Sequence, residues 1–133
     1  DLHSCTHSFP TRRSSDLNKK LDLVEIERAM KYLEGTHDFK SFSKANEEKD
    51  DFVRTIVQTN LIRNLKDVNK VTLSFVGTGF LRYQVRMMAQ TIIEAGLRHI
   101  EVEDVRRMLE AKDKHVCRYK ADPCGLYLVE VNY

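Results

Sequence analysis

Three segments of the chain carry apolar residues at the three- and four-residue spacing that is typical of an α-helix. These segments are residues 21–34, 80–95 and 102–111. In the first segment Asp22 is a suitable N-cap residue, and Gly35 follows the last apolar position. The pattern therefore predicts three amphipathic helices, each with one face directed toward a core.

Three other segments indicate β-strands. Residues 52–65 are rich in β-branched residues that alternate with polar ones, residues 71–76 alternate in the same way, and residues 126–132 follow an Asp-Pro-Cys-Gly turn. The connection between the first two is short, which favours antiparallel pairing. The predicted order is α-β-β-α-α-β, an α+β domain with an antiparallel sheet and helices packed on one face.

The segment between the first helix and the first strand, residues 35–51, has no long apolar period and is rich in polar residues. We interpret it as a loop that Phe39 and Phe42 anchor to the core. His37 and Asp38 within it would be an acid–base pair if they faced each other. Sequence neighbours rarely do, and a hydrogen bond that fixes the loop is the more common arrangement.

Length and composition exclude several classes of protein. A chain of 133 residues fits one domain, and no apolar run approaches the roughly 20 residues that a membrane-spanning helix needs. The three cysteines form no Cys-x-x-Cys pair, so neither a disulfide framework nor a zinc ribbon is expected. Cysteine usage of this kind favours a reducing, cytoplasmic setting.

The formal net charge of +2 hides an uneven distribution. Residues 1–20 hold four basic and two acidic side chains, whereas residues 21–133 are neutral overall. Within that neutral part, residues 53–98 hold seven basic side chains against two acidic ones. This segment is the expected contact region for a phosphate-bearing partner.

The first residues look foreign to the rest of the chain. Residues 1–17 do not begin with Met and follow no helical or strand period, and their string THSFPTRRSSDL resembles translated sequencing-adapter read-through. We therefore interpret residues 1–20 as a disordered, artefactual tail; the alternative is a genuine disordered basic arm. Its alternating His3, Cys5 and His7 have no fourth ligand nearby and are a weak indication of a metal site. Sequencing the native locus by an independent library method distinguishes the two interpretations.

Arginines on the second predicted helix are the main candidates for chemistry. Arg82, Arg86 and Gln90 share one helix face just after Gly77-Thr78-Gly79, an arrangement that suits an anion site or a solvated polar face, and spacing alone favours the latter. Arg86 stands out because its neighbours are apolar, and an arginine in such surroundings usually has a carboxylate or phosphate partner. No Ser-His-Asp, Cys-His or paired-carboxylate arrangement has convincing spacing.

Four motifs occur in one order and spacing: GTHDFKSFS at 35–43, RTI at 54–56, GFLRYQVRMMAQTIIEAG at 79–96 and DPCGLYLVEVNY at 122–133. Together they resemble the C-terminal half of the TruA-type tRNA pseudouridine synthases, over residues 21–133. The resemblance implies an enzyme that isomerises uridine to pseudouridine in the anticodon stem-loop of tRNA. It also implies a cytoplasmic homodimer that needs no cofactor and no metal.

The resemblance also assigns roles to individual residues. Arg86 matches the family arginine that pairs with the aspartate nucleophile, and Leu126 matches the leucine that lines the uracil pocket. Arg82 and Arg54 are candidates for contacts with tRNA phosphates. Phe39 and Phe42 are expected to pack beneath the site.

The sequence departs from the family pattern in three places. Gln90 replaces a residue that is usually small, residues 114–121 differ from the usual linker, and the Arg-Thr-Asp-x-Gly-Val-His motif with the nucleophile occurs nowhere in the chain. We therefore expect residues 21–133 to be the C-terminal domain of a pseudouridine synthase whose catalytic half is missing, inactive alone and prone to aggregate. The alternatives are a non-catalytic RNA-binding α+β module and a protein-interaction domain without an RNA role.

Overall fold

The computed structural model describes residues 2–10, 22–43, 52–63, 70–81, 83–113, 116–117, 119 and 126–131. The elements in these ranges are, in chain order, β1 (Leu2–Pro10), α2 (Leu23–Leu33), β2 (Gly35–Asp38), the 3-10 turn η1 (Lys40–Phe42), β3 (Val53–Arg63), β4 (Lys70–Gly77), α3 (Gln84–Gly96), α4 (Val102–Ala111) and β5 (Leu126–Val131). Arg82 and most of the predicted linker at 114–121 lie outside the described residues.

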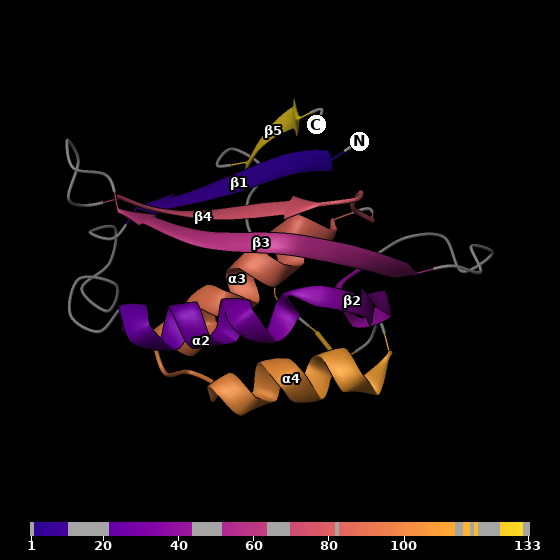
Figure 1. The fold of residues 1–133 in the computed structure, drawn as a ribbon. Coiled ribbons are helices and arrows are strands. Elements are labelled where there is room, and N and C mark those ends of the chain that lie inside the picture. The colour runs from indigo at the N-terminus through magenta and orange to yellow at the C-terminus, as the bar shows by residue number, and fades with distance from the viewer. Residues whose placement is uncertain are drawn as a thin grey trace.

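The described strands form one antiparallel sheet in the order β2-β3-β4-β1-β5. All three helices lie on the same side of this sheet, with α2 and α3 nearer to it and α4 packed against them (Figure 1). This arrangement confirms the predicted α+β class with helices on one face. The predicted element order is matched only roughly, because the structure adds the strands β1 and β2.

The expectation of a disordered N-terminal tail is wrong for residues 2–10. These residues form β1, which pairs with β4 from His3 to Pro10 and with β5 from Leu2 to His7. The strand was not predicted because its stability comes from partners sixty or more residues away, a tertiary effect that overrides weak local propensity.

The predicted loop at 35–51 begins with a strand. β2 runs from Gly35 to Asp38 and pairs with the first four residues of β3. The expected anchoring by Phe39 and Phe42 is confirmed, since both rings are fully buried. A strand of four residues at the edge of a sheet carries too short a pattern to be recognised from sequence.

The apolar faces that the sequence indicated meet in one core. Leu73 and Phe75 of β4 are fully buried, as are Met88 and Ile92 of α3. Cys5 of β1 lies opposite Phe75 and is buried with them, and burial raises the pKa of its thiol to about 11. The Cys5 thiol is therefore neutral at physiological pH and behaves as a small core residue.

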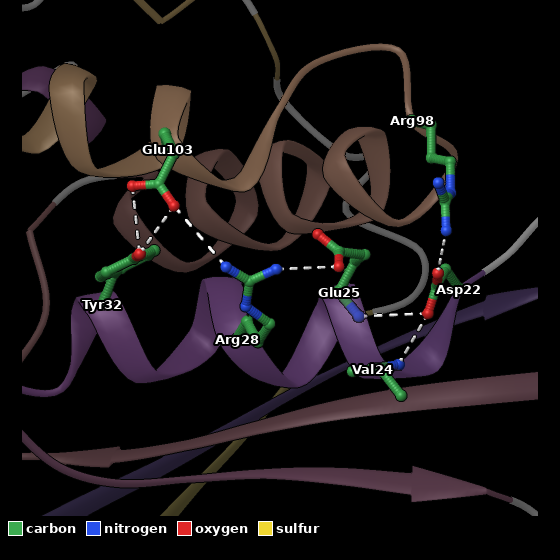
Figure 2. Close-up of polar contacts among 7 residues, drawn as sticks. All are labelled: Asp22, Val24, Glu25, Arg28, Tyr32, Arg98 and Glu103. Carbon is green, nitrogen blue, oxygen red and sulfur yellow. Dashed lines mark hydrogen bonds and ion pairs between the residues drawn. The ribbon is translucent and has the colours of Figure 1, made fainter.

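Asp22 connects the start of α2 to the end of α3 (Figure 2). Its Oδ1 accepts hydrogen bonds from the backbone N–H groups of Val24 (3.0 Å) and Glu25 (3.2 Å), as the predicted N-cap requires. Its Oδ2 accepts a hydrogen bond of 2.6 Å from Arg98. Glu25 does not return the bond of a capping box, and its carboxylate instead pairs with Arg28 at 3.0 Å.

The hydrogen bond from Arg98 holds the pKa of Asp22 below its ordinary value of 3.8, and the backbone hydrogen bonds from Glu25 and Val24 lower it further. A carboxyl with a lowered folded-state pKa stabilises the fold above its unfolded pKa, and this contribution is lost as the pH falls through the folded value. We therefore expect wild type to melt at a higher temperature than Asp22→Asn near neutral pH, with the difference vanishing in acid. Melting curves from neutral pH to below 3.8 measure this. A difference that stays constant over that range would contradict it.

Glu34 fixes β3 to the end of α2. Its Oε2 accepts hydrogen bonds from the Thr59 N–H (2.9 Å), the Thr59 hydroxyl (2.6 Å) and Lys31 (3.0 Å). Burial raises the pKa of Glu34, but these hydrogen bonds outweigh it and leave the pKa below its ordinary value of 4.5. The contact lies just beyond an irregularity in the β3–β4 register between Ile56 and Gln58. The strand is therefore held close to this irregularity by the side chain of the residue that caps the end of α2.

Candidate functional site

The candidate site is built on the segment that joins β4 to α3. At its start, a Cβ on Gly77 would lie 2.6 Å from the carbonyl oxygen of Thr55, so this close approach of two strands requires glycine. Thr78 then donates its N–H to the Thr55 carbonyl at 3.0 Å and accepts from the Thr55 N–H at 3.4 Å through its hydroxyl. These contacts hold the end of β4 against the first residues of β3.

The turn into α3 depends on a buried glutamine. The Gln84 side chain is fully buried, and its Oε1 accepts a hydrogen bond of 2.8 Å from the Leu81 N–H. The Gln84 N–H donates in turn to the Leu81 carbonyl at 3.0 Å. Tyr83, the N-cap residue between them, has the left-handed backbone conformation (φ 63°, ψ 6°).

Arg86 lies in the first turn of α3, three residues after Tyr83. Its side chain is half-buried, and its Cζ lies 4.9 Å from the centroid of the Tyr83 ring, a cation–π distance. Val85, Met87 and Met88 around it in sequence are all buried. The first turn of a helix carries partial positive charge, so a cation there is stabilised by an anion bound beside it. The position therefore suits an arginine that pairs with a carboxylate or phosphate.

Arg54 belongs to the same end of the sheet. It lies on β3 opposite His37 of β2, and its guanidinium donates to the Val53 carbonyl at 2.7 Å. The next residue, Thr55, is the one that holds Gly77 and Thr78. The backbone of Arg54 therefore lies next to Thr55, the residue that contacts the segment before α3.

For Leu126 and Arg82, the other two predicted site residues, the structure gives less detail. Leu126 begins β5, and its backbone lies opposite His7 of β1. β1 separates β5 from β4, so β1 determines where Leu126 lies relative to α3. Arg82 is outside the described residues.

His37 and Asp38 have separate partners, which confirms the interpretation of local hydrogen bonds. The His37 Nε2 lies 2.8 Å from the Glu34 carbonyl oxygen, and Asp38 accepts a hydrogen bond of 3.0 Å from the Lys40 N–H. Gln90, the departure from the family pattern on α3, is half-buried and donates to Glu94 at 2.9 Å. The larger residue is therefore accommodated at the helix surface and not in the core.

Two residues of the site were missed by sequence reasoning, Tyr83 and Gln84. Gln84 carries a usable signal, because it lies four residues before Met88 on the apolar stripe of the helix. A polar residue in such a stripe needs a buried hydrogen-bond partner. The sign of φ at Tyr83 has no comparable signal in the sequence.

Within the described ranges, no group of three or more His, Cys, Asp or Glu side chains is arranged to hold a metal ion. Among the helices that are described there, none has the length and apolar character of a membrane span.

Comparison with known proteins places the chain in a family. A family model described as tRNA pseudouridine synthase matches residues 29–133. A protein of Exiguobacterium sp. named tRNA pseudouridine synthase A is 44% identical over 126 residues, which cover 93% of this chain and 50% of that protein. The proteins of the same name from Exiguobacterium sibiricum and Limosilactobacillus reuteri are 39% and 38% identical over 96% and 100% of this chain.

The chain therefore belongs to the tRNA pseudouridine synthase family. It spans about half the length of the curated relatives it matches. The family model starts at residue 29, whereas the match to the Limosilactobacillus reuteri protein covers the whole chain, the first residues included. The interpretation of residues 1–17 as adapter sequence stays a prediction.

Proposed function

We propose that this chain forms the C-terminal wall of the active site in a tRNA pseudouridine synthase, an isomerase that acts on uridine in the anticodon stem-loop of tRNA. The observation that carries the proposal is the placement of Arg86. It combines a half-buried guanidinium, the first turn of a helix and a position within the residues that the family model matches.

The reaction exchanges one bond for another within a single nucleotide. The bond between uracil N1 and the ribose C1′ breaks, the base turns, and a bond forms between uracil C5 and the same C1′. The proton that leaves C5 is balanced by one gained at N1, and no electrons are gained or lost. A reaction with this balance needs no redox cofactor. An aspartate nucleophile assists the cleavage of the bond between base and sugar by nucleophilic catalysis.

Arg86 acts in this proposal by pairing with that aspartate. An arginine within a few ångströms of a carboxylate favours its ionised form, which is the nucleophilic one, and a bidentate contact also fixes its orientation. The half-buried position strengthens the pairing relative to one in open water. The nucleophile belongs to the Arg-Thr-Asp-x-Gly-Val-His motif, which residues 1–133 do not contain.

The remaining site residues have supporting roles. Leu126 supplies an apolar wall for the uracil ring. Arg54 and Arg82, which belong to the basic segment 53–98, contact tRNA phosphates. The exposed apolar side chains of Val53, Val57 and Ile62 on β3 support the expectation that further protein packs against this chain. The proposal includes a cytoplasmic homodimer in the complete enzyme and no activity for residues 1–133 alone.

A chimera tests the proposed function. The half of the Exiguobacterium sp. relative that this chain does not match is fused to the N-terminus of residues 1–133, and tritium release from tRNA carrying 5-tritiated uridine is measured. Because C5 loses its proton in the reaction, we expect release by the chimera and none by residues 1–133 alone.

Two outcomes would overturn parts of the proposal. Release by residues 1–133 alone would show that the nucleophile lies within them. A chimera that melts cooperatively and binds tRNA without releasing tritium would favour the alternative, a non-catalytic RNA-binding module.

A further inference from the structure

We propose that Tyr83 is a positioning residue for Arg86. The Tyr83 ring holds the Arg86 guanidinium, and the buried Gln84 holds Tyr83 in the backbone conformation that brings the ring there. This inference rests on the proposed role of Arg86 in pairing with the nucleophile.

The backbone of Tyr83 is unusual for the start of a helix. N-cap residues are normally extended, as at Asp22 (φ −89°, ψ 105°) and Glu101 (φ −86°, ψ 153°). Tyr83 caps α3 with φ 63°, in the left-handed region that a bulky side chain rarely adopts. Among the described residues, Arg98 and Lys112 are also non-glycine residues with positive φ, but they follow the ends of helices, where this conformation is common. The conformation of Tyr83 therefore needs a local cause.

Gln84 provides that cause. Its side-chain oxygen accepts from the Leu81 N–H while its own N–H donates to the Leu81 carbonyl, so two hydrogen bonds close the turn from both sides of Tyr83. Gln84 is fully buried and Leu81 is almost so. Opening the turn would leave a buried amide without its partner, which is costly. The turn thus fixes the backbone of Tyr83 whatever side chain it carries.

The fixed backbone places the Tyr83 ring against Arg86. The Cζ–centroid distance of 4.9 Å lies within the range of a cation–π contact. The Arg86 Cζ lies over the Tyr83 ring, so the contact is an electrostatic one made through the guanidinium carbon, and the guanidinium has five N–H donors in all. The contact therefore restricts the rotamers of Arg86 without using the donors that a bidentate carboxylate needs. Tyr83 is half-buried and also packs against the core, which holds the ring in place beside the guanidinium.

The contact between the Tyr83 ring and the Arg86 guanidinium predicts a spectroscopic effect at Arg86. In residues 1–133 labelled with ¹⁵N and ¹³C, we expect the Arg86 Hδ resonances to be shifted upfield by the Tyr83 ring current, and its Nε–Hε group to be ordered. Tyr83→Phe keeps the ring and should retain both. Tyr83→Asn tolerates the left-handed conformation but lacks the ring, and should lose both without a large fall in melting temperature. Arg106, an exposed arginine of α4, serves as the internal control and should not change.

The spectrum of the wild-type chain already tests the proposal. Random-coil Hδ shifts for Arg86 in wild type would overturn the proposal whether or not Tyr83→Asn folds. So would a folded Tyr83→Asn in which the shifts and order are unchanged. In the chimera, Tyr83→Asn should lower kcat by about 10- to 100-fold with little change in KM, as a small displacement of a catalytic group does. A chimera that melts cooperatively and binds tRNA but is inactive, together with the expected NMR result, would refute the proposed function and leave the contact between Tyr83 and Arg86 intact.

Discussion

Replacing Thr6 with proline is expected to destabilise the whole domain. Thr6 lies in the middle of β1, opposite Ser74 of β4 on one side and Tyr127 of β5 on the other. Because β1 has a strand on each side, the amide that proline removes faces a neighbouring strand in either direction, and proline is not tolerated in central strands. We expect a loss of about 1–3 kcal/mol, because the lost ladder hydrogen bond leaves a buried partner unpaired, from a total unfolding free energy of about 5–15 kcal/mol.

Denaturant-induced unfolding, followed by circular dichroism, measures this loss. Thr6→Val is the matched control, because it keeps a β-branched side chain at the same half-buried position and should change the midpoint little. If Thr6→Pro unfolds at the same denaturant concentration as wild type, residues 2–10 contribute nothing to the sheet. In that case the expectation of a disordered tail, made from the sequence, would be right for residues 2–10 and the pairing of β1 in the structure would be wrong.

The effect should reach β5 and through it the candidate site. β5 is joined to the rest of the sheet by its pairing with β1, and Leu126 is its first residue. Hydrogen exchange at the amides of β5 should therefore accelerate in Thr6→Pro more than exchange in α4, which packs against α2 and α3. Residues that the sequence assigned to a foreign tail thus help to position a residue assigned to the uracil pocket.

The elements that could be predicted from sequence are those whose stability is encoded locally. The period of α3 and the alternation of β4 are strong enough to fix both the type of element and the buried face. β1 lacks such a pattern, and its register depends on two strands that are distant in sequence. β2 is too short to show one. A single chain carries little information about pairings that form only in the folded sheet.

The same distinction applies to the site. Apolar neighbours in the sequence were enough to single out Arg86, because an arginine there has a clear electrostatic requirement. The left-handed Tyr83 could not be predicted, since many residues precede a helix without adopting positive φ. Gln84 was overlooked because helix propensity alone explains a glutamine at that position. Only its burial and its bond to Leu81 reveal what it does.

Removing the Arg86 side chain is expected to abolish most of the catalytic activity of the chimera. In Arg86→Ala the rate of tritium release should fall by about 100-fold or more, because the nucleophile loses the partner that orients it and keeps it ionised. Arg86→Lys should restore little, since a lysine ammonium cannot form the in-plane bidentate contact. Arg106→Ala is the control for loss of positive charge, because Arg106 is exposed and paired with Glu103 and Glu110 on its own helix.

The pH dependence identifies the mechanism of this loss. An aspartate without its arginine has a higher pKa, so the acidic limb of the rate profile should move to higher pH in Arg86→Ala, and the affinity for tRNA should change little. If Arg86 instead contacts a tRNA phosphate, Arg86→Ala would weaken tRNA binding and reduce its salt slope by about one, with no shift of the acidic limb. These two results exclude each other, and together with the Arg106→Ala control they separate a role in orienting the nucleophile from a role in holding the substrate.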